Sequence, residues 1–264
     1  MERQGTMEIR RLRLLEGARA AQGVVIIIDV FRAFTVCAYA AALGARPLVA
    51  VADADCARQL KRRLPRAVLS GEVRAWPIPD FDLGNSPSEL LRAVAGGLKL
   101  ARRPFIQRTG AGTQGVIHSR RARRIFVASL ANAVATALAI RRLAPPVVTL
   151  VAMGRAAEEP TDEDELCAEA IEAYLRGEEW PAGRRLADLF HTRRVQGLLA
   201  GELPPFPPSD VALCLAFNLF DFALQARRSG DVAVIRPIRV SEARLYPVSF
   251  APQAGAPPAR SVRR

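Results

Sequence analysis

Short apolar runs alternate with helix-like segments along most of the chain. Val24–Val30 is a β-branched run that carries Asp29 near its end, and Phe31–Leu43 follows with apolar residues on nearly all sides before Gly44. A strand that is apolar throughout, followed by a helix that is apolar all round, indicates that both are buried. Gly44 is a typical residue just beyond a helix end. This opening pattern is typical of a parallel sheet covered by helices on both faces.

The same alternation predicts the other elements. Strands are expected at Leu48–Ala52, Ala67–Leu69, Phe105–Gln107, Ile125–Ala128, Val147–Ala152 and Val232–Ile235. Helices are expected at Ala54–Arg63, from Ser86 onward, from Asn132 to near Arg142, from Asp162 to Arg176, at Ala187–Ala200 and at Val211–Leu224. Strands that alternate with helices predict an α/β fold, a three-layer α/β/α arrangement around a largely parallel or mixed sheet.

A single domain is expected to take up residues 1–250, followed by a disordered tail at 251–264 that is rich in Pro, Ala and Arg. Residues 28–33 and 128–133 both follow a buried strand and both open a helix of small residues. This spacing suggests two similar halves, at about 20–120 and 121–245. Two βαβ units also match in this way by chance, so duplication and coincidence both stay open.

Composition adds a strong positive charge. The 264 residues are 50% hydrophobic, enough for a substantial core, and carry a formal charge of +12. Such a charge favours a nucleic-acid partner. However, Lys61 and Lys99 are the only lysines, and aromatic residues make up only 6% of the chain. This pattern is more typical of GC-rich coding bias than of a surface that follows phosphates, so no nucleic-acid partner is expected.

The cysteines and the N-terminal segment bear on the compartment. Cys37, Cys56, Cys167 and Cys214 form no CxxC pair, and each lies within or beside an apolar stretch. They are interpreted as reduced, buried thiols, which favours a cytoplasmic protein. Residues 1–17 are charged throughout, and no segment reaches the roughly 20 apolar residues that a membrane span needs. No membrane partner is expected.

Polar residues recur where predicted strands end. Asp29, Asp53, Glu72, Thr109 and Ser129 all hold such positions. In an open parallel sheet, ligands bind in the crevice beyond the carboxyl ends of the strands, where helix N-termini also present free N–H groups to anions. Any one of these residues can instead be a helix cap, and this is the favoured reading of Asp53. Several of them together predict a binding site at this edge.

Asp29 and Arg32 leave the first strand three residues apart. They can hold a metal ion and an anionic oxygen respectively, or form a local ion pair at a helix start. Asp82 is either a metal ligand or part of an Asx turn. Ser86 is a candidate helix cap, which leaves Asn85 and nearby N–H groups free to contact a phosphate.

Two further segments have ambiguous patterns. Thr109–Gly115 contains three glycines, which suits a loop that lies close to a ligand, but it lacks the spacing of a nucleotide-binding P-loop. The acidic residues at 162–165 occupy the first turn of a helix, where they also complement the helix dipole. His118 and His191 lie far apart in Arg-rich contexts and receive no role.

An ordered set of motifs resembles the 2-phosphosulfolactate phosphatase family. The set spans about Val24 to Arg176, with a weaker echo at 210–214. Its most specific member is the run Phe81-Asp82-Leu83-Gly84-Asn85-Ser86-Pro87. The others are Ile28-Asp29-Val30-Phe31-Arg32-Ala33, Gly71-Glu72, Gly112-Thr113, Ser129-Leu130-Ala131-Asn132-Ala133, and Glu163-Asp164 with Cys167-Ala168.

The resemblance implies a Mg²⁺-dependent phosphatase that acts on phosphate esters of small 2-hydroxy acids, with a namesake reaction on the route to coenzyme M. Carried over by position, it implies catalytic roles for Asp29, Arg32 and Asn132, substrate contacts for Asn85, Ser86, Thr109 and Thr113, and metal ligands among Asp29, Glu72, Asp82 and Asp164. A small anionic phosphoester is the expected partner. A homodimer and the choice between water and a covalent nucleophile stay open.

The chain departs from the family pattern at two places. Archaeal-type members of the family tend to carry a Thr-Thr-x-Asn-Gly-Thr run, and this chain has no Asn in the corresponding segment, Thr109–Thr113. The family often has glycines after Gly71-Glu72, whereas this chain has Val73-Arg74-Ala75-Trp76. These changes leave the exact substrate open. The alternative functions are a protein that binds a small anion without turnover and, less favoured, a nucleic-acid binder.

Overall fold

One mixed sheet organises the computed structural model, which describes residues 7–241 and 243. Within these residues the sheet has ten strands in the order β1-β8-β2-β7-β9-β10-β3-β6-β4-β5. The strands are β1 (Glu8–Arg13), β2 (Gly23–Ile28), β3 (Leu48–Val51), β4 (Val68–Val73), β5 (Trp76–Pro77), β6 (Phe105–Arg108), β7 (Ala122–Ala128), β8 (Val147–Ala152), β9 (Phe222–Ser229) and β10 (Val232–Arg239).

Helices fill most of the connections. They are α1 (Leu14–Ala20), α2 (Ala33–Ala42), α3 (Ala54–Arg63), α4 (Pro87–Ala95), α5 (Gly112–His118), the 3₁₀ turn η1 (Leu130–Asn132), α6 (Ala133–Leu143), α7 (Asp162–Arg176), α8 (Ala182–Phe190), α9 (Arg193–Leu199) and α10 (Ser209–Leu215). The predicted strand–helix alternation is therefore confirmed through α7.

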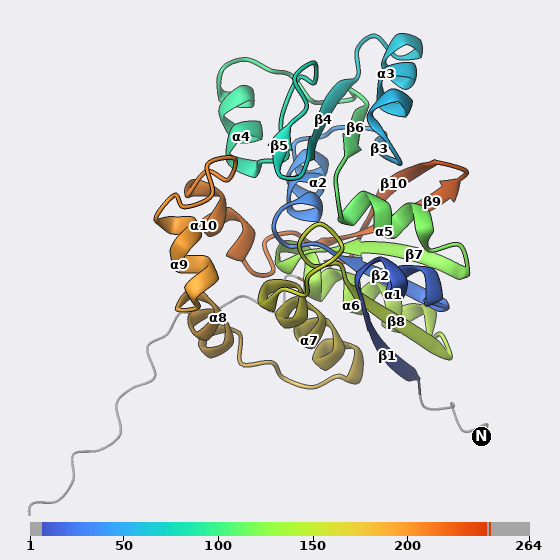
Figure 1. Cartoon of the computed structure of the whole chain (residues 1–264). Helices are drawn as coiled ribbons and strands as arrows, with labels where there is room; N and C mark the ends of the chain where they lie inside the picture. The colour runs from blue at the N-terminus through green and yellow to red at the C-terminus, as the bar shows by residue number, and fades with distance from the viewer. Residues whose placement is uncertain (1–6, 242, 244–264) are drawn as a thin grey trace, which may run out of the picture.

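The sheet consists of two parallel groups joined by an antiparallel hairpin (Figure 1). Strands β1, β8, β2 and β7 run parallel to one another, and so do β3, β6 and β4. The hairpin β9–β10 pairs antiparallel with β7 on one side and with β3 on the other. This arrangement confirms the expected mixed sheet, and its three antiparallel pairings make the two parallel groups run in opposite directions.

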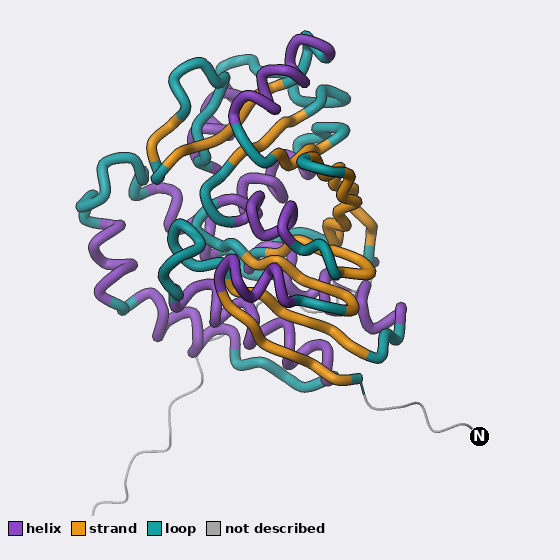
Figure 2. The backbone as a smooth tube through the Cα atoms, turned by 45° about the vertical axis from the view of Figure 1, so that its right-hand side comes forward, coloured by secondary structure: helices purple, strands orange, loops and turns teal. Residues whose placement is uncertain are grey.

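Side chains of β2 alternate between two hydrophobic clusters. Val24, Ile26 and Ile28 pack in a cluster with residues of α6 to α10, whereas Val25 and Ile27 pack in a cluster with residues of α1, α2 and α5. Because successive side chains of a strand point to opposite faces, a strand that is apolar throughout needs helices on both sides. The structure has this three-layer arrangement, with helices on either side of the strands (Figure 2).

The segment after β2 forms the buried helix that the sequence predicts. All residues from Ala33 to Ala41 in α2 are buried, including Phe34 and Tyr39. Small alanine side chains let this helix approach α4, α5 and β3 on several sides. Because α2 begins directly after Arg32, this buried helix fixes the backbone around Asp29 and Arg32.

Several elements differ from the prediction. The charged N-terminal segment, for which no element is expected, forms β1 and α1; β1 is an edge strand with mostly exposed or half-buried side chains, so it lacks an apolar run. Thr109–Gly115 is not a loop throughout, because α5 begins at Gly112 and buries Thr113 and Val116. Its glycines permit close packing rather than flexibility.

The C-terminal predictions are partly wrong. The expected helix 187–200 is two helices, α8 and α9, separated at His191–Thr192, where the Thr192 side chain accepts a hydrogen bond from the N–H of Val195. The expected helix 211–224 ends at Leu215, and β9 begins at Phe222. An apolar run of this length fits either a buried helix or a buried strand, and sheet pairing decides here in favour of the strand.

The proposed halves interleave in the sheet, since β2 of the first lies between β7 and β8 of the second. The duplication stays a prediction, and the tail at 251–264 lies outside the described residues. Cys37, Cys167 and Cys214 are buried free thiols as expected, whereas Cys56 is half-buried. In the part of the chain that the structure describes, no helix is long and apolar enough to span a membrane.

Candidate active site

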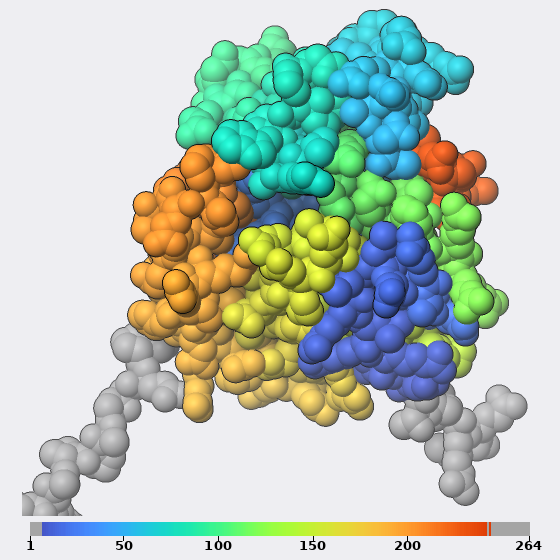
Figure 3. Space-filling model, viewed as in Figure 1, coloured from blue at the N-terminus to red at the C-terminus, as the bar shows by residue number. Residues whose placement is uncertain are grey.

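A cavity of about 760 Å³ is lined by segments that follow strands of both parallel groups. The segments at the ends of β2 and β8 form one wall, and those at the ends of β4 and β6 form a second. A third wall comes from α9 and the segment 203–206. In Figure 3 the hollow lies between the teal, yellow and orange surfaces, with blue atoms recessed between them. Its position agrees with the prediction that ligands bind beyond the carboxyl ends of the strands.

Asp29 lies in this cavity directly after β2 and is 5% exposed. One carboxylate oxygen accepts a hydrogen bond from the N–H of Ala33 at 3.0 Å, and the other accepts from the N–H of Gly112 at 2.8 Å. These two donors belong to the N-terminal ends of α2 and α5. The carboxylate is therefore held in one orientation, and each of its oxygens keeps a further lone pair for a ligand.

Asp164 braces the loops on either side of Asp29. It lies in the first turn of α7, is 2% exposed, and accepts hydrogen bonds at 2.8 Å from the N–H groups of Val30 and Gly154. Burial raises the pKa of Asp164 well above its usual value, and the charge of Asp29 raises it further. Asp164 is thus close enough to Asp29 for their charges to interact, although it does not line the cavity.

Burial also raises the pKa of Asp29, to about 7. The hydrogen bonds from Ala33 and Gly112 oppose the shift, while the charges of Glu72 and Glu163 add to it. Because the folded pKa lies above the unfolded value, the protonated acid stabilises the folded state. That contribution is complete below the unfolded pKa of about 3.8 and is lost as the pH rises through 7.

We therefore expect the metal-free protein to become less stable between pH 5 and pH 8. For a single group with these two pKa values, the free energy of unfolding falls by roughly 2–3 kcal/mol over this interval. Urea denaturation in the presence of a chelator measures the effect, and Asp29→Asn supplies the comparison. A variant that retains the full pH dependence would assign the effect to other groups.

Glu72 is the second-last residue of β4 and also lines the cavity. Its carboxylate accepts hydrogen bonds from the N–H of Gly110 and, at 2.6 Å, from the N–H of Ala75. The Arg108 side chain donates to the Glu72 carbonyl oxygen at 2.6 Å. Glu72 consequently fixes the turn into β5 and the backbone after β6, and it presents a second carboxylate to the cavity.

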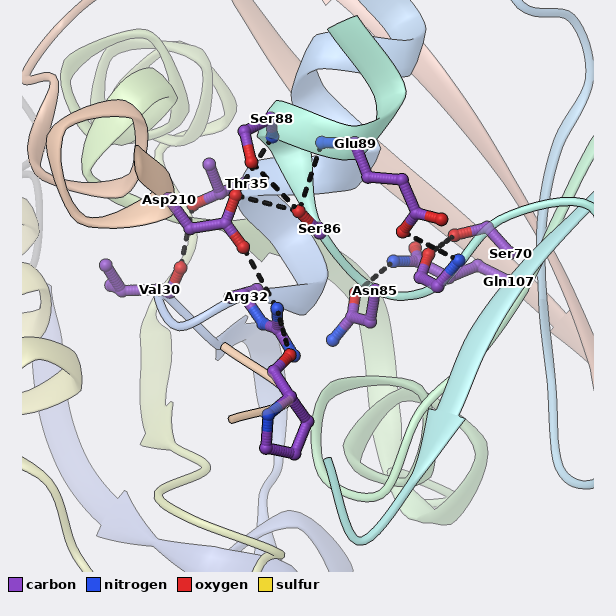
Figure 4. A network of polar contacts seen from close by, with 12 residues as sticks. Val30, Arg32, Thr35, Ser70, Asn85, Ser86, Ser88, Glu89, Gln107 and Asp210 are labelled. Atoms are coloured by element: carbon purple, nitrogen blue, oxygen red, sulfur yellow. Dashed lines mark hydrogen bonds and ion pairs between the residues drawn. The ribbon is translucent and has the colours of Figure 1, made fainter. Parts of the chain in front are cut away.

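Arg32 and Asn85 supply the donors of the site. Arg32 is 4% exposed and lines the cavity, and its Nη1 donates to Asp210 at 2.9 Å. Asn85 also lines the cavity, and its side-chain oxygen accepts from Gln107 at 3.2 Å. Figure 4 shows both side chains within one polar network. Among the described residues the amide nitrogen of Asn85 has no hydrogen-bond partner, so it remains available to a ligand.

Four candidates from the sequence lie behind the cavity wall rather than in it. Ser86 caps α4 through a 3.1 Å bond from the N–H of Glu89 and donates to Asp210. Thr109 and Thr113 bond to each other, at 2.9 Å from the Thr109 N–H to the Thr113 hydroxyl. Asn132 accepts from the N–H of Ser129 at 3.0 Å and is fully buried. The substrate contacts predicted for Ser86, Thr109 and Thr113 stay predictions. So does the catalytic role predicted for Asn132.

Asp82 is not brought to the site. Its carboxylate accepts from the N–H of Leu69 at 2.8 Å and pairs with Lys61 at 3.0 Å, with the side chain 43% exposed. The side chain holds this segment against β4 through an N–H 13 residues earlier in the chain, so the contact is not a local Asx turn. A metal-ligand role for Asp82 stays a prediction. Over the described ranges, no three His, Cys, Asp or Glu residues are arranged as a ready metal cluster.

Several lining residues were missed. Arg108 and Gly154 adjoin strand ends, so a stricter use of the strand-end rule would have included them. Arg194 and Phe206 come from the helical C-terminal part, and no motif in the sequence marked them. Arg194 pairs with the buried Glu163 at 3.1 Å, and this contact joins α9 to the first turn of α7.

Comparison with known proteins identifies the family. The sequence model of the family described as 2-phosphosulpholactate phosphatase matches residues 11–192, more than half of the chain. The chain belongs to the 2-phosphosulfolactate phosphatase family. This result confirms the resemblance drawn from the motifs.

Relatives in this family match most of their length. A protein of Bacillus subtilis named probable 2-phosphosulfolactate phosphatase is 29% identical over 226 residues, which cover 83% of this chain and 93% of the relative. A Thermus thermophilus protein of the same name is 32% identical over 231 residues, covering 84% and 92%. A third, from Symbiobacterium thermophilum, is 34% identical over 187 residues, covering 68% and 76%.

The family model covers only part of the cavity, whereas the alignments to the Bacillus subtilis and Thermus thermophilus relatives extend beyond it. The family match ends at residue 192, whereas Arg194 and the segment 203–206 form one of the walls. The C-terminal helices of this chain therefore contribute directly to a site whose other walls lie within the matched region.

Proposed function

We propose that the protein is a phosphatase that hydrolyses the phosphate ester of a small 2-hydroxy acid. The observation that carries the proposal is one cavity in which the carboxylates of Asp29 and Glu72 share the lining with Arg32, Arg108 and Asn85. Cationic and amide donors fit an anionic substrate, and the carboxylates fit a divalent cation that accompanies phosphate. The names of the relatives support the same reaction class.

Donor side chains bind the substrate anion in this proposal, and the carboxylate of Asp29 is held in place by backbone N–H groups. Arg32 offers planar N–H donors to the phosphate or the acid group of the substrate, and they neutralise negative charge as the P–O bond breaks. Asn85 orients a second oxygen through its free amide nitrogen. The N–H groups of Ala33 and Gly112 hold Asp29 at 3.0 and 2.8 Å, so no reorganisation is needed when the substrate binds.

Mg²⁺ is the proposed cofactor, held by Asp29 and Glu72 with Asp164 behind them. The support is the set of carboxylates: burial raises the pKa of Asp29, and the charges of Glu72 and Glu163 raise it further. A cation would relieve that repulsion. Mg²⁺ needs only one or two protein carboxylates, because it keeps several waters and binds phosphate oxygens directly. When bound, it would supply charge neutralisation to the transferring phosphoryl group.

A substrate panel tests this proposal. Phosphate release is measured for phosphate esters of several 2-hydroxy acids, 2-phosphosulfolactate among them, with Mg²⁺, with EDTA, and with Mg²⁺ restored after EDTA. We expect turnover of at least one ester, loss of nearly all of it in EDTA, and recovery on adding Mg²⁺. Tight binding of the esters without any phosphate release would instead establish the non-catalytic alternative, and turnover that resists EDTA would remove the metal from the proposal.

A further inference from the structure

A buried carboxylate in the C-terminal helical part, beyond the residues that the family model matches, connects three parts of the site. Asp210 lies in the first turn of α10 and is fully buried. One of its oxygens accepts from the Ser86 hydroxyl at 2.8 Å and from the N–H of Ser88 at 3.0 Å. The other oxygen accepts from Arg32 at 2.9 Å. Figure 4 shows Asp210 between the start of α4 and Arg32.

The C-terminal part holds Arg32 at three points. Besides the Asp210 bond, Nη1 of Arg32 donates to the carbonyl oxygen of Pro205 at 3.2 Å. Its guanidinium lies over the ring of Phe206, 4.5 Å from the centroid, and that ring packs edge-on against Phe31. All three supports come from the segment 205–210, which the family match does not include.

These contacts use only one side of the guanidinium. Nε and Nη2 of Arg32 have no hydrogen-bond partner among the described residues, and they are not among the buried polar atoms left without a partner. Arg32 lines the cavity. Arg32 therefore has two donors free for a substrate anion in the cavity, while Nη1 serves as the anchor.

We infer that Asp210 is a positioning residue that orients Arg32 toward the substrate anion and couples this orientation to the start of α4. The inference rests on the proposed function, in which Arg32 binds the phosphate or the acid group. A long Arg side chain without this anchor has several rotamers, and a displacement of about 1 Å at a substrate-binding group lowers turnover strongly. Asp210 contacts no substrate itself, because it lies behind Arg32.

Asp210→Asn tests the inference with the change of a single atom. The Asn oxygen can still accept from Ser86 and Ser88, but its amide nitrogen replaces the acceptor that Arg32 needs. We expect kcat/KM to fall roughly 100-fold and the inhibition constant of inorganic phosphate to rise. The control is Glu169→Gln, which makes the same change of one atom in another Arg pair, with Arg185 at 2.5 Å, outside the cavity lining. The control is expected to keep wild-type kinetics.

A double-mutant cycle separates positioning from a general loss of structure. If Asp210 acts through Arg32, adding Asp210→Asn to Arg32→Ala changes kcat/KM little beyond the effect of Arg32→Ala alone. If the two losses multiply instead, Asp210 acts by another route and the inference is overturned. Wild-type kcat/KM and phosphate inhibition in Asp210→Asn would also overturn it.

A second variant and a measurement that needs no turnover complete the test. Should Asp210→Asn fail to fold, Phe206→Leu removes the ring below the guanidinium and leaves Asp210 in place; we expect a several-fold rise in the phosphate inhibition constant, and an unchanged constant would contradict the inference. Calorimetric titration of inorganic phosphate into wild type and Asp210→Asn needs no turnover. If the protein shows no phosphatase activity but its phosphate affinity still depends on Asp210, the proposed function is wrong and the positioning role stands.

Discussion

Replacing Asp29 with asparagine is expected to lower turnover of the phosphoester substrate by roughly 1000-fold, the scale observed when a group that stabilises transition-state charge is removed. Asp29 has nearly the same shape as asparagine, so the cavity keeps its volume. The amide removes the negative charge that is proposed to hold Mg²⁺, and its NH₂ group faces one of the N–H donors of Ala33 or Gly112. The loss should appear in kcat as well as in Mg²⁺ dependence.

The matched control for this experiment is Asp53→Asn. Asp53 also follows a strand of the sheet, but it is exposed, lies outside the cavity lining, and caps α3 through the N–H of Cys56 at 2.7 Å. Asparagine is an equally good cap, so both activity and stability should stay near wild type. The comparison requires both variants to unfold cooperatively. An Asp29→Asn protein that is folded and fully active would remove Asp29 from the site.

The sequence was sufficient for the part of the site that follows the parallel strands. A β-branched run followed by an all-round apolar helix can satisfy its burial only in a sheet covered on both faces, so the positions of Asp29 and Arg32 followed from local pattern. Glu72 was found as a strand-end residue, but the shared-edge rule does not explain why it lies near Asp29. Three antiparallel pairings separate β2 from β4, so these two strands run in opposite directions. All three side chains line the cavity.

The rest depends on contacts that local pattern does not encode. Asp82 lies in the most specific motif, yet its carboxylate binds Lys61 and the N–H of Leu69 instead of lining the cavity. The local sequence pattern does not predict either contact. Asp210 and Phe206 reach Arg32 across more than 170 residues of chain, with Arg32 and Asp210 separated by 178 positions. No periodicity signals such pairs, since they arise only when the C-terminal helices dock beside α4.

The second large effect is expected from Gly112→Ala, which adds one methyl group next to Asp29. The new Cβ would lie 2.8 Å from the Asp29 Oδ2 atom, 2.9 Å from the Cβ of Ala33 and 3.1 Å from the Phe34 ring. All three neighbours are buried, so the carboxylate or α2 must move. We expect kcat/KM to fall roughly 100-fold through misplacement of Asp29 and the free energy of unfolding to fall by about 1–3 kcal/mol.

Gly183→Ala is the control that isolates this crowding. Gly183 lies in α8, and a Cβ added there meets nothing within 4 Å. The same methyl group should therefore leave kcat/KM unchanged and, because alanine favours helix, should not lower the urea midpoint. Both variants are compared by kinetics and by urea denaturation at one pH. If Gly112→Ala instead matched Gly183→Ala in both measurements, the N–H of Gly112 would not be a fixed partner of Asp29, and the orientation assigned to this carboxylate would be wrong.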